Sequence, residues 1–221
     1  KAQALILAGA VLVNQQKIDK PGQSVPDDAA IELLGQTRFV SRGGLKLEAA
    51  LEQFDINVAG KVCLDVGTST GGFTDCLLQR GAARVHAIDV GPSQMDWRLR
   101  QDPRVVVHDH TNARYVEPAV TGEAAHFAAF DLSFISTTLV LGPVARLLTP
   151  DARIVVLVKP QFEVGREQVG KGGIVRDPAL HQAACQKVRE AAEALGFQCR
   201  LIPCPVLGAE GNQEFLLYGE H

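Results

Sequence analysis

The sequence predicts an α/β fold built on an open, mostly parallel β-sheet. From Lys61 onward, short apolar runs typical of strands alternate with segments that have the pattern of helices. One run, Val62 to Val66, ends in a glycine-rich turn that leads into a helix, as in the strand–turn–helix unit of such sheets. A second run, Arg153 to Val158, is almost continuously apolar, as a central strand covered on both faces should be.

The alternation predicts seven strands and five helices in this part of the chain. The strands are expected at 61–66, 84–89, 104–108, 126–131, 152–159, 197–203 and 213–218. The helices are expected at 72–80, 94–100, 112–117, 136–148 and 177–195. Asp177 and Pro178 suit the N-cap and first position of the last helix, and Gly196 suits its end.

Residues 1–35 are short and turn-rich. They are expected to hold the end of a helix over Lys1–Ala8 closed by Gly9, a hairpin joining Val11–Val13 to Ile18, and a strand over Ala30–Leu34. Such a segment is too small to hold a core unaided. Because the chain begins at Lys1 without a Met, we expect it to be a fragment that lacks some N-terminal residues.

A polar linker with two arginines is expected to follow, and two glycines, Gly43 and Gly44, come directly after it. The linker covers residues 36–42, ahead of a helix at 45–54 whose apolar positions predict a buried face. Ser41 is predicted to cap that helix. The main domain would then span residues 43–221.

Composition limits the classes of protein to which the chain can belong. Its 221 residues are 46% hydrophobic, which is enough for one medium domain with a buried core. The net charge of −3 gives no general attraction for nucleic acid, so a polynucleotide site must be a local patch. Five cysteines without a C-x-x-C pair indicate a reduced, cytoplasmic protein without structural disulfides or zinc. No run approaches the roughly 18 apolar residues of a membrane helix.

The glycine-rich turn after residue 66 predicts a site for a ligand that carries a ribose. Gly67, Gly71 and Gly72 remove side chains where a ligand must approach the backbone. Asp65 lies where a carboxylate can reach the polar groups of the ligand. Asp89, at the tip of the next predicted strand, is where a ribose-binding carboxylate is expected.

Two further charged residues end strands of the same predicted sheet. Asp131 and Lys159 should project into the crevice beside the turn, because ligands bind at the carboxyl ends of parallel strands. Together they suggest a base and its electrostatic partner. A lysine acts as a base near neutral pH when burial or a neighbouring cation lowers its pKa, and a second lysine would supply such a cation.

Five motifs make the chain resemble the TlyA family of RNA 2′-O-methyltransferases, which are of the FtsJ-like type and are often labelled haemolysins. They are Val-Ser-Arg-Gly-Gly-Leu-Lys-Leu, Asp-Val-Gly-Thr-Ser-Thr-Gly-Gly-Phe-Thr-Asp, Asp-Leu-Ser-Phe-Ile-Ser, Val-Lys-Pro-Gln-Phe-Glu-Val-Gly and Gly-Asn-Gln-Glu-Phe-Leu-Leu-Tyr. They run over essentially the whole chain in the order of the family. One departure is Arg38-Phe39-Val40, where an Arg-x-Trp-Val-like tetrapeptide is expected.

The resemblance implies a Rossmann-like class I methyltransferase that uses S-adenosyl-L-methionine, with helices on both faces of its sheet. It implies a small S-four-type RNA-binding module in residues 1–35, here truncated, and an FtsJ-like domain in 43–221. Members of the family methylate cytidine 2′-hydroxyls in ribosomal RNA, so ribosomal RNA or ribosomal subunits are the expected partners, with no membrane. The motifs do not predict the target nucleotide or the oligomeric state.

Residue by residue, the resemblance implies a catalytic tetrad and a cofactor site without a metal. The tetrad falls on Lys46, Asp131, Lys159 and Glu214, with Glu214 in the last strand. Cofactor contacts are expected from Asp65, Gly67, Ser69, Thr70, Gly71, Gly72, Phe73, Asp89 and Asp109, the last of these near the adenine. The better candidates for phosphate contacts are Arg38, Arg42, Arg166, Lys171 and Arg176.

Three other interpretations compete with this one. A nicotinamide-dependent dehydrogenase would use a similar turn, but the glycines do not form G-x-G-x-x-G. A membrane-active haemolysin would need an exposed amphipathic or spanning segment, and no such segment is evident in the sequence. A non-catalytic RNA-binding module would leave the four charged positions of the tetrad without a reason.

Overall fold

The structure is a computed structural model. It describes residues 3, 6, 11–14, 16–18, 20–26, 29–33, 38–92, 94–208 and 211–221. The chain forms two compact units, residues 1–39 and residues 40–221.

The first unit holds a small antiparallel sheet of order β2-β1-β3. Its strands are β1 (Val11–Val13), β2 (Gln16–Ile18) and β3 (Ile31–Leu33). Val11 pairs with Ile18 and Val13 with Gln16, which confirms the predicted hairpin. The predicted end of a helix at Ala8 and Gly9 lies outside the described residues.

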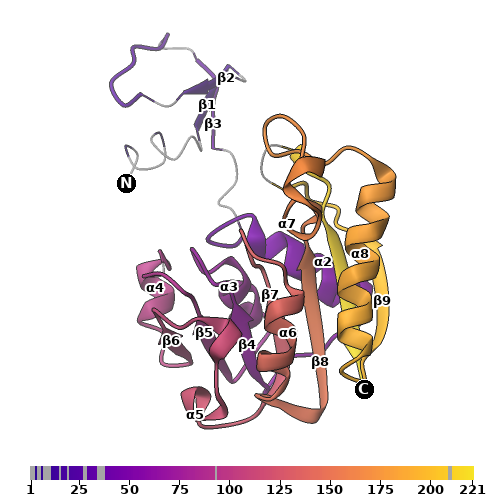
Figure 1. The fold of residues 1–221 in the computed structure, drawn as a ribbon. Helices are drawn as coiled ribbons and strands as arrows, with labels where there is room; N and C mark the ends of the chain where they lie inside the picture. Colours follow the sequence, from indigo (N-terminus) through magenta and orange to yellow (C-terminus); the bar gives the residue numbers. More distant parts are fainter. Residues whose placement is uncertain are drawn as a thin grey trace. The chain divides into compact units, whose positions relative to one another are not determined.

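The second unit is built on a sheet of order β6-β5-β4-β7-β8-β10-β9 (Figure 1). Its strands are β4 (Val62–Val66), β5 (Arg84–Ile88), β6 (Val105–His108), β7 (Ala125–Phe130), β8 (Leu148–Val158), β9 (Gln198–Pro203) and β10 (Phe215–Glu220). The pairs from β6 to β8 are parallel, and β10 is antiparallel to both β8 and β9. The predicted mostly parallel, seven-stranded sheet is confirmed.

The order of the strands fixes where a ligand can bind. The chain runs outward from β4 through β5 to β6 and then returns to place β7 on the other side of β4. The loops that follow β4 and β7 therefore leave the sheet in opposite directions and open a crevice at their carboxyl ends. Gly67 follows β4 and Asp131 follows β7, so both predicted site residues lie at this switch point.

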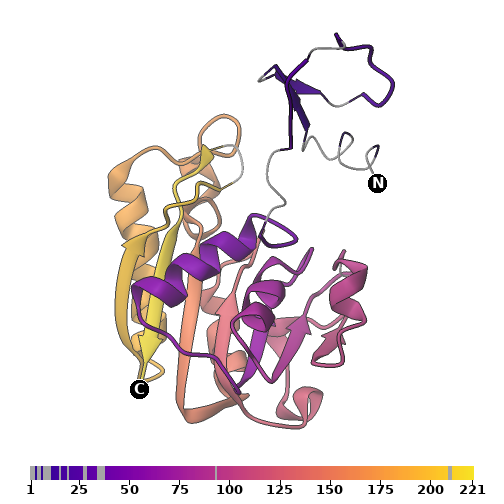
Figure 2. The same ribbon diagram turned by 180° about the vertical axis from the view of Figure 1, so that it is seen from behind.

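Helices cover both faces of the sheet. They are α2 (Gly43–Gln53), α3 (Gly72–Gln79), α4 (Trp97–Arg100), η1 (Ala113–Tyr115), α5 (Pro118–Thr121), α6 (Thr138–Ala145), α7 (Pro160–Glu163), η2 (Arg166–Gln168) and α8 (Pro178–Glu193). Figure 1 shows α6 and α8 over one face, and Figure 2 shows α2 and α3 over the other. Leu64, Phe130 and Val156 of the central strands are almost completely buried between these layers.

Three predicted helices are shorter in the structure, and the one predicted at 136–148 covers only α6, with β8 already beginning at Leu148. The segment predicted at 94–100 is helical only over α4, because Asp96 caps it by accepting a bond from the amide of Arg98. The segment predicted at 112–117 is a single 3₁₀ turn, η1, and Pro118 starts a separate short helix at the first position, where proline is tolerated. The last helix follows the prediction, since the Asp177 carboxylate accepts from the amide of Ala179 and Gly196 has φ of +94°.

The prediction that Ser41 caps the helix before β4 is wrong. Helix α2 begins at Gly43 with Arg42 in the N-cap position, and no side chain caps it. The Ser41 carbonyl instead accepts a bond from the amide of Gly44. The Ser41 hydroxyl lies against Gly72, where a Cβ atom would come within 2.2 Å of it. Ser41 therefore packs α2 onto the glycine-rich turn.

The described residues contain no group of three or more His, Cys, Asp and Glu residues that could hold a metal ion. All five cysteines are free thiols, and burial raises the pKa of Cys63 to about 12. A thiol with so high a pKa stays protonated and unreactive at neutral pH, so Cys63 is a core residue.

Candidate active site

The Asp65 carboxylate is bonded to α3, the helix that follows the glycine-rich turn. Its Oδ2 atom accepts bonds from the Thr74 amide at 2.9 Å and from the Thr74 hydroxyl at 2.6 Å. The residue is completely buried, and desolvation raises the pKa of its carboxyl to about 7 despite these bonds. Its Oδ1 atom has no hydrogen-bond partner among the described residues. Because Asp65 lines the adjoining cavity, this atom has the capacity to accept a hydrogen bond from a ligand there.

The glycines of the turn are also required by the protein itself. A Cβ atom on Gly67 would lie 2.5 Å from the carbonyl oxygen of Asp131, and Gly67 has φ of +89°. A Cβ atom on Gly71 would lie 2.6 Å from Leu99 of α4. Gly71 is in the left-handed region as the N-cap of α3. Close packing between loops, in addition to ligand approach, therefore explains these two positions.

Asp89 follows β5 and shapes the other side of the turn. Its Oδ2 accepts from the amide of Ser69 at 2.8 Å, and its Oδ1 accepts from the amide of Gly91 at 3.1 Å. Each carboxylate oxygen has a second lone pair, so Asp89 can hold the loop and still accept from hydroxyl groups of a ligand.

A cavity of about 810 Å³ extends from Asp89 along the carboxyl edge of the sheet. Its other lining residues include Gly67, Ser69, Thr111 and Asn112. Asp109, the predicted adenine contact, is not one of the described residues that line this cavity. Its carboxylate instead forms an ion pair with Arg100 at 2.7 Å. Residues just beyond Asp109, such as Thr111 and Asn112, therefore form this wall of the cavity.

The four residues of the predicted tetrad form two ion pairs. Lys46 Nζ, from α2, lies 2.6 Å from Glu214 Oε2, and both side chains are nearly buried. Lys159 Nζ, at the end of β8, lies 2.6 Å from Asp131 Oδ1 and donates to the Ser133 hydroxyl at 3.0 Å. Glu214 lies one residue before β10 rather than inside the last strand. Each lysine is thus matched with one carboxylate.

The two ion pairs lie together in a second cavity, of about 430 Å³. Asp65, Gly67, Ser69, Thr70, Gly72 and Phe73 of the predicted cofactor site line the same cavity. Gly67, Ser69, Asp131, Ser133 and Phe134 line both cavities, which makes them one continuous cleft across the switch point. Of the predicted cofactor residues, all of which are described, only Gly71 and Asp109 line neither part.

Several residues of this cleft are not among the predicted site residues. Phe134 is 91% exposed at its rim, has φ of +64° and lies against Phe162 with ring centroids 5.1 Å apart. Ser133 and Gln161 also line the wall beside Lys159. These four residues, Phe134, Phe162, Ser133 and Gln161, belong to the motifs that contain Asp131 and Lys159. Their position in the sequence beside charged strand ends could have identified them as part of the site.

The predicted phosphate contacts differ in their relation to the cleft. Arg42 lines the 430 Å³ cavity. Arg166, Lys171 and Arg176 are exposed in the loop region between α7 and α8. Arg38 belongs to the first unit and is exposed there.

The cleft fits S-adenosylmethionine. An amino-acid ammonium requires acceptors, and the unpartnered Oδ1 of Asp65 is a buried one. In open α/β sheets a carboxylate at a strand tip commonly binds a ribose, and Asp89 is in that position. The backbone from Gly67 to Thr70 separates these two acceptors and lines the cleft between them.

Comparison with known proteins agrees with this geometry. The model of the FtsJ-like methyltransferase family matches residues 39–221. The 16S/23S rRNA (cytidine-2′-O)-methyltransferase TlyA of Mycobacterium tuberculosis is 46% identical over 99% of this chain and 82% of its own length. Hemolysin A of Brachyspira hyodysenteriae is 40% identical over 99% of this chain and 92% of its own. A solved structure described as a hemolysin of Streptococcus thermophilus has a TM-score of 0.83 at 45% identity and covers 99% of this chain and 81% of that one.

Proposed function

The chain belongs to the FtsJ-like methyltransferases, within the TlyA family, and from that membership we propose that it methylates the 2′-hydroxyl of ribose in ribosomal RNA, with cytidine as the expected nucleoside. As a member it is an enzyme that depends on S-adenosylmethionine. The observation that carries the proposal is the pair of lysine–carboxylate contacts in one cavity beside the glycine-rich turn. The relative from M. tuberculosis bears the name of that activity on cytidine.

The residues of the turn would hold the cofactor. Asp65 Oδ1 would accept from its ammonium group, Asp89 would accept from its ribose hydroxyls, and the turn between them would follow its length. When bound, S-adenosylmethionine supplies an electrophilic methyl group and leaves as the neutral thioether.

Lys159 would act as the general base. In its neutral form, Nζ would take the proton of the ribose 2′-hydroxyl as the oxygen forms its bond to the methyl carbon and the bond from sulfur to that carbon breaks. Asp131 and Ser133 hold Lys159 by two contacts and thereby fix the direction of its nitrogen. Lys46, fixed by Glu214, would orient the acceptor oxygen. Because the neutral sulfur product needs no acid, positioning would supply most of the acceleration.

The RNA would enter over the rim of the 430 Å³ cavity. Arg42 would contact a phosphate beside the acceptor ribose. Arg166, Lys171 and Arg176 would contact phosphates further along the RNA strand. The exposed ring of Phe134 offers a surface on which an unstacked base can lie. We also propose that residues 1–35 are part of an S-four-type RNA-binding module.

The test is to map methyl groups on ribosomal RNA after incubation with the protein and S-adenosylmethionine. Mass spectrometry of nucleosides from the modified RNA should show a ribose-methylated nucleoside, and primer extension should place it at one or a few positions. Methylation of a base, or no transfer to ribosomal RNA, would contradict the proposal.

The name of the Brachyspira relative raises membrane lysis as an alternative activity. Of the helices among the described residues, none has the length and apolar character needed to cross a bilayer. Incubation with dye-loaded liposomes tests the alternative: we expect no leakage above the buffer control, and release of dye would support lysis.

A further inference from the structure

Glu163 is a buried carboxylate that the proposed chemistry does not use. Only 1% of its side chain is exposed, and it is the last residue of α7, four positions after Lys159. Glu163 is not one of the described residues that line either part of the cleft. Burial of a carboxylate is unfavourable unless hydrogen bonds and an opposite charge compensate for it, so its partners indicate its role.

Both oxygens of the Glu163 carboxylate are bonded to the start of α6. Oε1 accepts from the amide of Thr137 at 2.7 Å, and Oε2 accepts from the hydroxyl of Ser136 at 2.5 Å. Thr137 is the N-cap of α6, so the negative charge also lies at the positive end of a helix. These bonds tie α7 to the far end of the loop that begins at Asp131.

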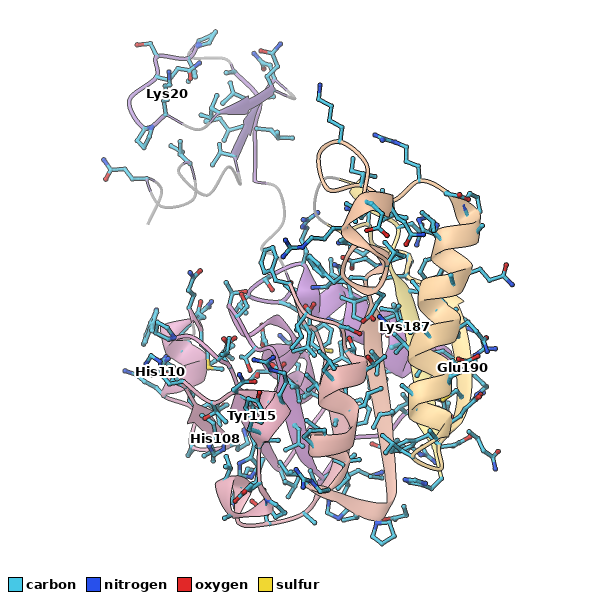
Figure 3. All side chains as sticks on the ribbon, viewed as in Figure 1. Lys20, His108, His110, Tyr115, Lys187 and Glu190 are labelled. Carbon is cyan, nitrogen blue, oxygen red and sulfur yellow. The ribbon has the colours of Figure 1, made fainter. Side chains whose placement is uncertain are left out.

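Lys187 of α8 holds the same carboxylate from the other side. Its Nζ lies 3.2 Å from Oε2 and donates to the carbonyl oxygen of Glu163 at 2.8 Å. Lys187 and Glu190 both project from α8, and Glu190 is exposed (Figure 3). The Glu163 carboxylate therefore joins three elements, α6, α7 and α8.

These contacts close a ring of chain that includes the proposed base, Lys159. One arm runs from Asp131 through Phe134 to Thr137, and the other runs from Lys159 to Glu163. The Lys159–Asp131 ion pair joins the arms at the cleft, and the bond from Thr137 to Glu163 joins them at the opposite end. Release of the second junction would remove the anchor that both arms have at the start of α6, so the Lys159–Asp131 contact would no longer be held in a fixed position.

We propose that Glu163 is a positioning residue for methyl transfer, which sets Lys159 against Asp131 by locking α7 to the start of α6. This inference rests on the proposed function. A displacement of about 1 Å at a reacting group can lower a rate about 100-fold, so loss of the lock should act on the chemical step.

Glu163→Gln is the informative variant because it conserves volume. Its amide oxygen can still accept from Thr137, but its NH₂ group cannot accept from Ser136 and faces the ammonium of Lys187, so the variant breaks the part of the lock that Oε2 makes. Glu190→Gln on α8 is the matched control, since Glu190 is exposed and is bonded by Gln186.

We expect Glu163→Gln to lower the single-turnover rate about 10- to 100-fold, with KM for RNA and the cofactor Kd changed by less than about twofold. Amides of residues 131–137 should exchange hydrogen faster than in the wild type, by more than any loss of global stability accounts for. Glu190→Gln should match the wild type in every measurement.

The proposal is overturned if Glu163→Gln matches Glu190→Gln in rate and exchange. It is also overturned if the rate falls only in proportion to lost folding or lost cofactor affinity. If the wild-type protein transfers no methyl group to ribosomal RNA, the proposed function fails instead, and the exchange of residues 131–137 alone then decides whether Glu163 positions the loop.

Discussion

At the scale of single residues, burial of the Asp65 carboxyl costs stability, and we propose that its unpartnered Oδ1 binds the cofactor. The buried carboxyl has a pKa raised from 3.8 to about 7, chiefly by desolvation. The folded protein therefore binds a proton that the unfolded chain has released between these values, so this group makes stability fall as pH rises from about 4 to about 7.

Asp65→Asn should separate these two effects. The amide oxygen can keep the bonds from Thr74, and the NH₂ group replaces the unpartnered acceptor. We expect the cofactor-free variant to melt at a higher temperature than the wild type at pH 8 and to lose this part of the pH dependence. Cofactor affinity should fall roughly 10- to 100-fold, as for a lost bond to a charged donor. Calorimetric titration with unchanged affinity would contradict the assigned role of Oδ1.

At the scale of elements, the loop before β10 sets the position of Glu214. A Cβ atom on Gly208 would lie 2.1 Å from Glu214 Oε1 and 2.6 Å from its Cδ. Gly208→Ala should therefore displace the carboxylate from Lys46 and lower the methyl-transfer rate at least about 10-fold, while cofactor binding is retained. Gly142→Ala in α6 is the control, because nothing lies within 4 Å of its Cβ position. Equal rates for the two variants would show that Glu214 is not needed in its place.

The edge of the sheet at β5 and β6 should respond to acid. His86 Nδ1 lies 2.9 Å from His108 Nε2, and His86 Nε2 lies 3.0 Å from Glu123. Burial, and then the neighbouring His86, lower the pKa of His108 below 6.5. The folded state thus takes up a proton here less readily than the unfolded chain, and stability should be lost as pH falls below about 6.5.

His108→Gln should flatten this part of the pH dependence. Urea unfolding at pH 7 and pH 5 measures it, with His126→Gln as the control because His126 is exposed on β7. If the unfolding free energy of the His108 variant changed with pH as steeply as that of the wild type, the His86–His108 pair would not be the source of the pH dependence.

At the scale of the whole molecule, the sheet could be predicted from the sequence, but several helix boundaries could not. Central strands such as Arg153–Val158 are apolar on both faces, and that pattern is visible without tertiary contacts. The helix predicted at 112–117 became a 3₁₀ turn because Asn112 and Pro118 interrupt it, and local bonds of this kind override periodicity.

The site was predictable where chemistry lies at strand ends. Asp89, Asp131 and Lys159 each follow a strand and Asp65 is the next-to-last residue of β4, so the sheet brings them to one edge. Which lysine pairs with which carboxylate could not be predicted, because Lys46 and Glu214 meet across 168 residues of chain. The role of Gly208 and the lock at Glu163 depend on packing between loops in the same way.

In the proposed mechanism, Lys159 is held by Asp131 and takes the proton of the acceptor hydroxyl. Single-turnover methyl transfer to ribosomal RNA by Lys159→Ala tests it most directly, with Lys61→Ala as the control at the opposite end of the sheet. We expect Lys159→Ala to lose at least about 100-fold in rate while calorimetry shows nearly unchanged affinity for S-adenosylmethionine. A rate close to that of the wild type would contradict this mechanism.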